Sequence, residues 1–143
     1  MYINCKGHLI DLDRPRVMGI LNLTPDSFYD GGKYKSASEI LAQVEKMLKE
    51  GATFIDIGAY SSRPGAIHIS QEEELSRLLP VLQLMIQEFP DALVSVDTFR
   101  SHVASEAIQS GACMVNDISG GSLDEDMFNT IAELQVPYIL MHM

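Results

Sequence analysis

Five apolar runs, separated by segments of helical character, constrain the fold of this chain more than any other feature of its sequence. The runs begin near positions 17, 53, 93, 113 and 137, about 30 residues apart on average. Between them, apolar residues recur at helical spacing, so strands and helices should alternate. Because the runs are apolar on both faces, they predict a parallel sheet covered by helices.

The expected elements follow from these runs and from helix start signals. We expect strands at 17–23, 53–57, 93–96, 113–118 and 138–141. Helices should open near Ser36, Ser70, Asp97 and Ser122. Three of them begin with capping boxes, SASE, SQEE and SLDE, while Asp97 and Thr98 are expected to cap the remaining helix. Pro80 should kink the second helix.

Repeating units of this length are typical of a (β/α)8 barrel of TIM type, which needs about 250 residues. With 143 residues, the chain would form only the first half of such a barrel, as a single domain over 1–143 with five strands and four helices within 17–143. Residues 1–16 should form a β-hairpin, turning at Lys6-Gly7, and a linker, with the hairpin closing the bottom of the barrel. The structural alternative is a complete open sheet of flavodoxin type, although its phosphate loop would be shorter than the loop after the first strand here.

Composition limits the partners and the compartment. The net charge of −10, from 20 acidic and 10 basic residues, argues against nucleic acid or an anionic membrane as a partner. No apolar run approaches the roughly 18 residues that span a bilayer, and the N-terminus lacks a signal-peptide core, so we expect a soluble, cytoplasmic protein. Cys5 and Cys113 have no metal-binding spacing and are expected to be reduced thiols in the core.

Every predicted strand ends in a polar side chain. These residues are Asn22, Asp56, Asp97, Asn116, Asp117 and His142. In a parallel barrel the strand ends share one rim, which is the expected active face. Buried polar groups without partners cost about 1 to 3 kcal/mol each, so five strands that repeat this pattern favour a functional rim. The alternative for any single residue, most plainly for Asp97, is that it caps the following helix.

Two polar loops follow the first two strands, with the sequences TPDSFYDGG and GAYSSRPGA. Loops of this length in a compact domain are usually functional or disordered. Arg63, followed by Pro64, could bind an anion or stack on a flat ring; the alternative is a solvated arginine in a surface turn.

Four stretches together resemble the N-terminal half of the dihydropteroate synthase family. In order, they are MGILNLTPDSFYDGG, IDIGAYSSRPGA, SVDTFRSHVASEAIQSGACMVNDISG and ILMHM, within 17–143. That family is a (β/α)8 barrel that joins 6-hydroxymethyl-dihydropterin diphosphate to p-aminobenzoate and releases pyrophosphate in the presence of Mg2+, and sulfonamides compete with p-aminobenzoate. The resemblance implies the same transferase activity in a full-length homodimer. It also implies that the present fragment is inactive, because the family's later strands supply further site residues.

The resemblance also implies roles for the strand-end residues. Asp97 would accept hydrogen bonds from the amino group and a ring N–H of the pterin, and Asn116 would bind the same ring. Asp56 would help to order this floor. Asn22 would bind Mg2+ or contact the diphosphate through a neutral oxygen.

The loop residues are implied to act around the second substrate. Ser62, Arg63 and Pro64 would line the p-aminobenzoate pocket, with Ser62 also contacting the pterin. Arg63 and Asp30 would be catalytic, Asp30 by stabilising positive charge on the pterin methylene as pyrophosphate leaves. Ala59-Tyr60 and Ser62 stand where many relatives carry Gly-Glu and Thr.

Two other functions stay open on the sequence alone. A pterin-dependent methyltransferase half-barrel would share the strand-end Asp and Asn but gives no reason for the two loops. A non-catalytic module could instead assemble through the strands at its open edges, because unpaired edges invite pairing with another chain.

Overall fold

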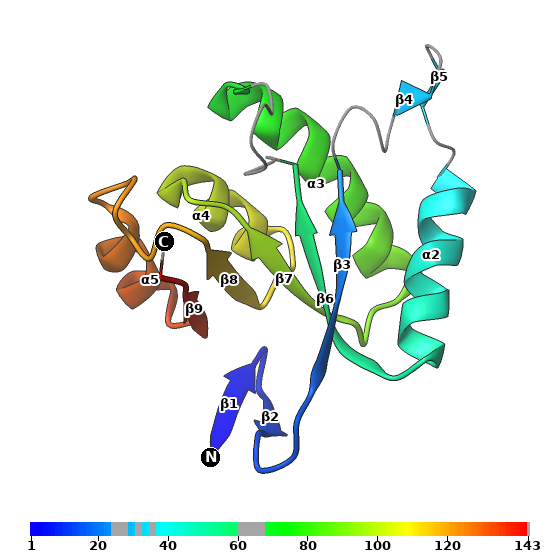
Figure 1. Cartoon of the computed structure of the whole chain (residues 1–143), viewed down its shortest axis with the longest axis horizontal. Coiled ribbons are helices and arrows are strands. Elements are labelled where there is room, and N and C mark those ends of the chain that lie inside the picture. Colours follow the sequence, from blue (N-terminus) through cyan, green and yellow to red (C-terminus); the bar gives the residue numbers. More distant parts are fainter. Residues whose placement is uncertain (24–28, 31–32, 35–36, 60–67, 143) are drawn as a thin grey trace.

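A single parallel sheet organises the chain, which is represented by a computed structural model. The structure describes residues 1–23, 29–30, 33–34, 37–59 and 68–142. The strands lie side by side in the order β3 (Val17–Asn22), β6 (Ala52–Gly58), β7 (Leu93–Asp97), β8 (Met114–Asp117) and β9 (Tyr138–Leu140) (Figure 1). Spatial order therefore equals chain order, whereas a flavodoxin-like sheet reverses direction after its first crossover. The predicted half-barrel of TIM type is confirmed, and the open-sheet alternative is wrong.

Four helices flank the sheet in the described part of the chain. They are α2 (Ala37–Lys49), α3 (Gln71–Glu88), α4 (Ser101–Gln109) and α5 (Met127–Leu134) (Figure 1). Their buried residues, such as Val44, Leu82 and Val103, pack with Ile55 and Val94 of the strands in one apolar cluster. Alternate strand residues therefore face the helices, and the residues between them face the inside of the half-barrel. None of these described helices combines the length and the apolar character needed to cross a membrane.

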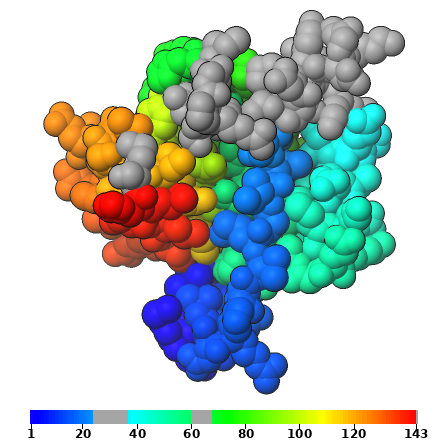
Figure 2. All heavy atoms as spheres, in the orientation of Figure 1, coloured from blue at the N-terminus to red at the C-terminus, as the bar shows by residue number. Residues whose placement is uncertain are grey.

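The N-terminal hairpin closes one end of this half-barrel, as the sequence predicts. Strands β1 (Tyr2–Cys5) and β2 (His8–Asp11) pair antiparallel through a turn in which Lys6 and Gly7 have φ of 53° and 83°. Figure 2 shows the hairpin, in dark blue, projecting from one end of the molecule below β3. It contributes Cys5 to a second cluster, with Cys113 and the inward-facing residues that begin the strands. Both cysteines are buried free thiols, which confirms their predicted place in the core.

One small element lies where the sequence predicted only loop. Strands β4 (Tyr29–Asp30) and β5 (Lys33–Tyr34) pair antiparallel within the segment after β3. The loop was predicted from the proline and glycine residues of that segment. Aromatic residues such as Tyr29 and Tyr34 favour strands, and they form the small sheet. Asp30 therefore belongs to a short hairpin.

The start of α3 follows its local sequence signal. Ser70 is the N-cap, and its hydroxyl oxygen accepts a hydrogen bond from the Glu73 amide at 3.2 Å. Pro80 lies inside this helix, which continues to Glu88, and the predicted kink stays a prediction.

The predicted cap of α4 is wrong. Asp97 ends β7, and the residue at the N-cap is Arg100, which makes no side-chain cap hydrogen bond. Thr98 Oγ1 does accept a hydrogen bond from the Arg100 amide at 3.1 Å, inside the turn that precedes the helix. The Asp97 side chain therefore does not cap the helix and lies at the rim, at the carboxyl end of β7.

The predicted start of α5 at Ser122 is also wrong, because the helix begins at Met127. Asp124, a member of the SLDE box, instead accepts a hydrogen bond from the Ser101 amide of α4 at 2.7 Å. Burial would raise the pKa of Asp124, but hydrogen bonds from the Ser101 amide, the Ser101 side chain and the Asp126 amide together hold it below its usual value. A contact between α4 and the turn before α5 has replaced the local capping box.

Candidate functional site

Three predicted site residues meet at the carboxyl ends of β6, β7 and β8. Asp56 lies beside Ser95 in the sheet register, and Asp97 lies beside Asn116. Asn116 Nδ2 donates a hydrogen bond to Asp56 Oδ2 at 3.2 Å, across the intervening strand β7. The strand period of two places all four side chains on the inward face, above the apolar cluster that the hairpin covers. The sequence prediction that Asp56, Asp97 and Asn116 share a rim is therefore confirmed.

The two aspartates of this cluster hold unusual pKa values. Burial raises the pKa of Asp56, which is only 3% exposed. Two neighbours oppose this rise. The Ser95 hydroxyl group lies close to the carboxylate, although too poorly aligned for a regular hydrogen bond, and Asn116 donates a hydrogen bond to it. Burial, followed by the negative charges of Asp56, Glu74 and Asp117, raises the pKa of Asp97 to about 7. Asp97 is thus poised to gain or lose a proton near neutral pH.

Three polar side-chain atoms of the cluster are buried without a hydrogen-bond partner among the described residues. They are Asp56 Oδ1, Ser95 Oγ and Asn116 Oδ1. Leaving a polar atom in this state costs about 1 to 3 kcal/mol, and native proteins rarely tolerate it without a reason. Together with the Asp97 carboxylate, these atoms form a surface that accepts hydrogen bonds from a ligand rich in N–H groups.

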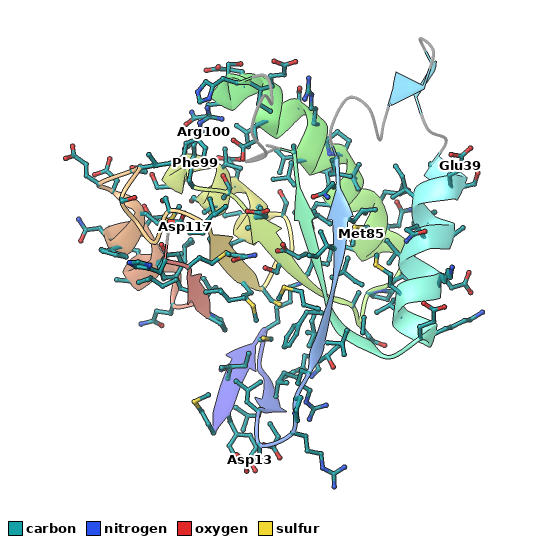
Figure 3. All side chains as sticks on the ribbon, viewed as in Figure 1. Asp13, Glu39, Met85, Phe99, Arg100 and Asp117 are labelled. Atoms are coloured by element: carbon teal, nitrogen blue, oxygen red, sulfur yellow. The ribbon has the colours of Figure 1, made fainter. Side chains whose placement is uncertain are left out.

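Asp117, labelled in Figure 3, is the next residue along β8. Its carboxylate accepts hydrogen bonds from Ser119 N at 2.9 Å, Ser119 Oγ at 2.8 Å, Gly121 N at 2.9 Å and the Tyr138 hydroxyl at 2.6 Å. These bonds tie the loop after β8 to β9. Asp117 therefore belongs to the scaffold of the rim.

The Asp97 side chain packs closely against Gly58. A Cβ atom at Gly58 would lie 3.0 Å from Asp97 Cβ and 3.3 Å from one carboxylate oxygen. A side chain at position 58 would therefore crowd Asp97, which would have to shift by a few tenths of an ångström. The missing side chain of Gly58 allows this close approach.

Asn22 and His142 lie at the same end of the sheet. Asn22 ends β3, pairs in register with Gly58 and has an exposed side chain. The predicted rim position of Asn22 is confirmed. His142 follows β9 and is exposed.

The remaining predicted site residues fall on the two polar loops. Ser62, Arg63 and Pro64 lie outside the described residues. Asp30 is described only as part of strand β4. The structure thus assembles the predicted pterin floor, and the roles of these loop residues stay predictions.

Sequence reasoning missed one buried carboxylate close to this cluster. Glu74 is fully buried near the start of α3 and pairs with Arg100. Its position could have been noticed, because it precedes Leu78 by four residues and Val81 by seven, on the buried stripe of the helix.

The described fold and sequence match known proteins. Residues 18–143 match a family described as "Pterin binding enzyme". A folate synthesis bifunctional protein of Arabidopsis thaliana is 53% identical over 139 residues, which are 95% of this chain and 29% of that protein. A dihydropteroate synthase of Bacillus subtilis is 47% identical over 130 residues, 91% of this chain and 45% of that protein.

Solved structures give the same result. A Xanthomonas albilineans dihydropteroate synthase with 4-aminobenzoic acid superposes with a TM-score of 0.89 at 42% identity, covering 99% of this chain and 52% of that one. The same organism's enzyme in complex with 7,8-dihydropteroate gives a TM-score of 0.85 at 38% identity, with 100% and 51% covered. The chain therefore spans about half the length of these solved relatives and of the bacterial one, and less of the bifunctional plant protein.

Proposed function

The chain belongs to the pterin binding enzyme family, and from this premise we propose that it is the pterin-binding half of a dihydropteroate synthase. The whole enzyme would join 6-hydroxymethyl-dihydropterin diphosphate to p-aminobenzoate and release pyrophosphate. One observation carries the proposal: the bonded pair Asp56 and Asn116, beside Asp97, presents unpartnered acceptors on the inward face. The names of the relatives and the ligands in the Xanthomonas albilineans structures support the same reaction.

The chemistry of the cluster suits one edge of a pterin ring. That edge carries an amino group and a ring N–H, two donors that an ionised Asp97 can accept together. Because Asn116 Nδ2 already donates to Asp56, its Oδ1 remains as an acceptor for the ring. Asp56 thereby fixes the orientation of the Asn116 amide.

Bond formation would occur above this floor. The amine of p-aminobenzoate attacks the pterin methylene carbon, the carbon–oxygen bond to the diphosphate breaks, and the amine loses a proton. Ser62, Arg63 and Pro64 would bind p-aminobenzoate, and Asp30 would stabilise the positive charge that develops on the methylene. No covalent nucleophile is needed, so rate enhancement would come from positioning and electrostatic stabilisation.

Mg2+ fits the rim through Asn22. The exposed amide oxygen of Asn22 is a hard neutral ligand, and Mg2+ commonly keeps several waters and substrate phosphate oxygens in its coordination sphere. Within the described ranges, no three His, Cys, Asp or Glu side chains lie close enough together to hold a metal ion. When bound, Mg2+ would neutralise charge on the departing pyrophosphate.

Two further parts of the proposal concern the whole protein. We propose that it is a homodimer in the cytoplasm, as the resemblance and the sequence predict. Light scattering of the full-length protein and fractionation of cells test these two statements separately. A monodisperse monomer, or recovery of the protein with an organelle, would contradict the corresponding one.

Pterin binding by the present chain tests its share of the function. Titration with 6-hydroxymethylpterin, followed by ligand fluorescence, should give saturable binding that p-aminobenzoate alone does not compete away. Absence of binding to the folded chain at pH 8 would overturn the proposed pterin site.

An activity assay tests the rest. The full reading frame should form dihydropteroate from both substrates, whereas residues 1–143 alone should not. Turnover by the 143-residue chain at the rate of a complete enzyme would contradict its assignment as an inactive half.

A further inference from the structure

A buried ion pair lies directly behind the pterin floor. The carboxylate of Glu74, with 0% of the residue exposed, accepts a hydrogen bond from Arg100 Nη1 at 2.6 Å and another from Thr98 Oγ1 at 2.7 Å. Removing two charges from water is expensive, and such pairs often stabilise a fold no better than apolar residues of similar size. Beyond any contribution to stability, the ion pair fixes the positions of Glu74, Arg100 and Thr98 relative to one another.

Arg100 joins several segments through one guanidinium group. In addition to the bond from Nη1 to Glu74, Nη2 donates to the Ile69 carbonyl oxygen at 2.7 Å, and the guanidinium carbon Cζ lies 4.8 Å from the ring centre of Phe99. Figure 3 shows Arg100 and Phe99 between α3 and α4. A planar fork with several donors makes such contacts together, whereas a lysine ammonium would make fewer of them.

The network reaches the site through Thr98. Its hydroxyl group is bound to Glu74, and its amide donates to the Asn116 carbonyl oxygen at 3.1 Å. Asp97 is the preceding residue and is limited on its other side by Gly58. The ion pair thus holds the chain immediately after Asp97 against the strand that carries Asn116.

We propose that Glu74 and Arg100 are positioning residues of the pterin site, holding Asp97 in register with Asn116 and Asp56. This inference rests on the proposed function. A displacement of about 1 Å in a recognition group can cost about 100-fold in activity, so a modest change in this pair should be measurable at the site.

The pair also interacts electrostatically with Asp97. Burial raises the pKa of Asp97 most, and the negative charges of Asp56 from β6, Glu74 from α3 and Asp117 from β8 raise it further. Arg100 carries the compensating positive charge beside Glu74. Changing Glu74 should therefore alter the titration of Asp97, which a purely structural residue would leave unchanged.

Glu74→Gln and Arg100→Lys test the inference, and Glu73→Gln is the matched control. Glu73 lies one residue away on the same helix and forms an exposed ion pair with Arg77. Two measurements are made on chains verified as folded by circular dichroism: 6-hydroxymethylpterin affinity at pH 8.5, and the Asp97 pKa by carboxyl 13C NMR without ligand.

Glu74→Gln should weaken pterin binding about tenfold and lower the Asp97 pKa. Arg100→Lys keeps the positive charge, so the Asp97 pKa should stay near that of the unmodified chain while pterin affinity falls because the fork is lost. Glu73→Gln should match the unmodified chain in both measurements.

Folded Glu74→Gln with unchanged pterin affinity and an unchanged Asp97 pKa would overturn the inference. Equal losses in Glu73→Gln and Glu74→Gln would overturn it as well. An unmodified chain that binds no pterin is a different failure, because it removes the proposed function while the NMR titration still reports whether Glu74 acts on Asp97.

Discussion

Two neighbouring polar clusters at the end of the sheet differ in how fully their hydrogen-bonding capacity is used. The Asp117 carboxylate accepts hydrogen bonds from four donor groups, and the Tyr138 hydroxyl and the loop after β8 are fixed around it. The Asp56 and Asn116 pair shares one hydrogen bond, and each side chain keeps a buried oxygen without a partner in the described structure. The saturated carboxylate therefore supports the fold, whereas the cluster with unpartnered atoms is the proposed binding site.

The difference arises from a single step along β8. Successive strand residues point to opposite faces, so Asn116 faces the inside of the half-barrel and Asp117 faces away from it. Inside, the neighbours are Asp97 and Asp56 on other strands, whose side chains are mainly acceptors. Outside, the loop supplies backbone N–H donors. Two adjacent residues of β8 therefore have different roles: Asn116 belongs to the proposed binding site, and Asp117 stabilises the fold.

The largest expected effect comes from removing the saturated carboxylate. Asp117→Ala should lower the free energy of unfolding by about 4 kcal/mol, because several buried donors lose their acceptor. Urea denaturation followed by circular dichroism measures this loss. A change below about 1 kcal/mol would show that Asp117 is not the scaffold residue described here.

Asp97→Asn should weaken pterin binding, whereas Asp117→Ala weakens the fold. The variant places an amide N–H donor opposite the N–H donors of the pterin, so 6-hydroxymethylpterin affinity at pH 8 should fall about 100-fold, or about 2.7 kcal/mol. Fluorescence titration measures the change. Asp117→Ala, studied at a temperature where it remains folded, is the control and should retain most of its pterin affinity.

The same Asp97→Asn variant should be more stable than the unmodified chain at pH 8. The folded pKa of Asp97, about 7, lies above the ordinary value of 3.8, so folding of the ionised form is opposed. The gain should be about 2 kcal/mol, half of the full pKa difference because Asp97 keeps some contact with solvent. It should shrink as the pH falls from 7 toward 4, which thermal unfolding at several pH values can follow.

Tyr138→Phe removes one of the donors to Asp117 and leaves the pterin floor intact. Stability should fall by about 1.5 kcal/mol, as is usual for a hydrogen bond to a charged group. Denaturant midpoints measure the loss. A fall in pterin affinity larger than the fall caused by Asp97→Asn would reverse the division between the two clusters.

The smallest effect is the pH dependence of the unmodified chain. Since ionised Asp97 is the proposed acceptor and its pKa is about 7, pterin affinity should fall about tenfold from pH 8 to pH 6. Titrations across this range should give a midpoint near pH 7 that is absent in Asp97→Asn. Affinity that rises as the pH falls would contradict the role of the ionised carboxylate.

Local sequence signals predicted the elements better than their ends. The apolar runs located all five sheet strands, and the hairpin turn at Lys6 and Gly7 was confirmed. The capping box at Ser70 acts as predicted, whereas Asp124 of the box at Ser122 binds the Ser101 amide of another helix. Similar local patterns therefore had different outcomes, because a tertiary donor competes with the local one.

The sequence by itself determined the alternation of strands and helices, the apolar faces and the polar residue at each strand end. These features depend on residues only a few positions apart, so periodicity and turn chemistry are enough to reveal them. The tertiary structure alone decided that the strands wind in one direction, that Asp97 titrates near neutral pH and that Glu74 pairs with Arg100. The physical reason is that burial and electrostatic interactions depend on distance in space, and the partners concerned come from separate strands and helices.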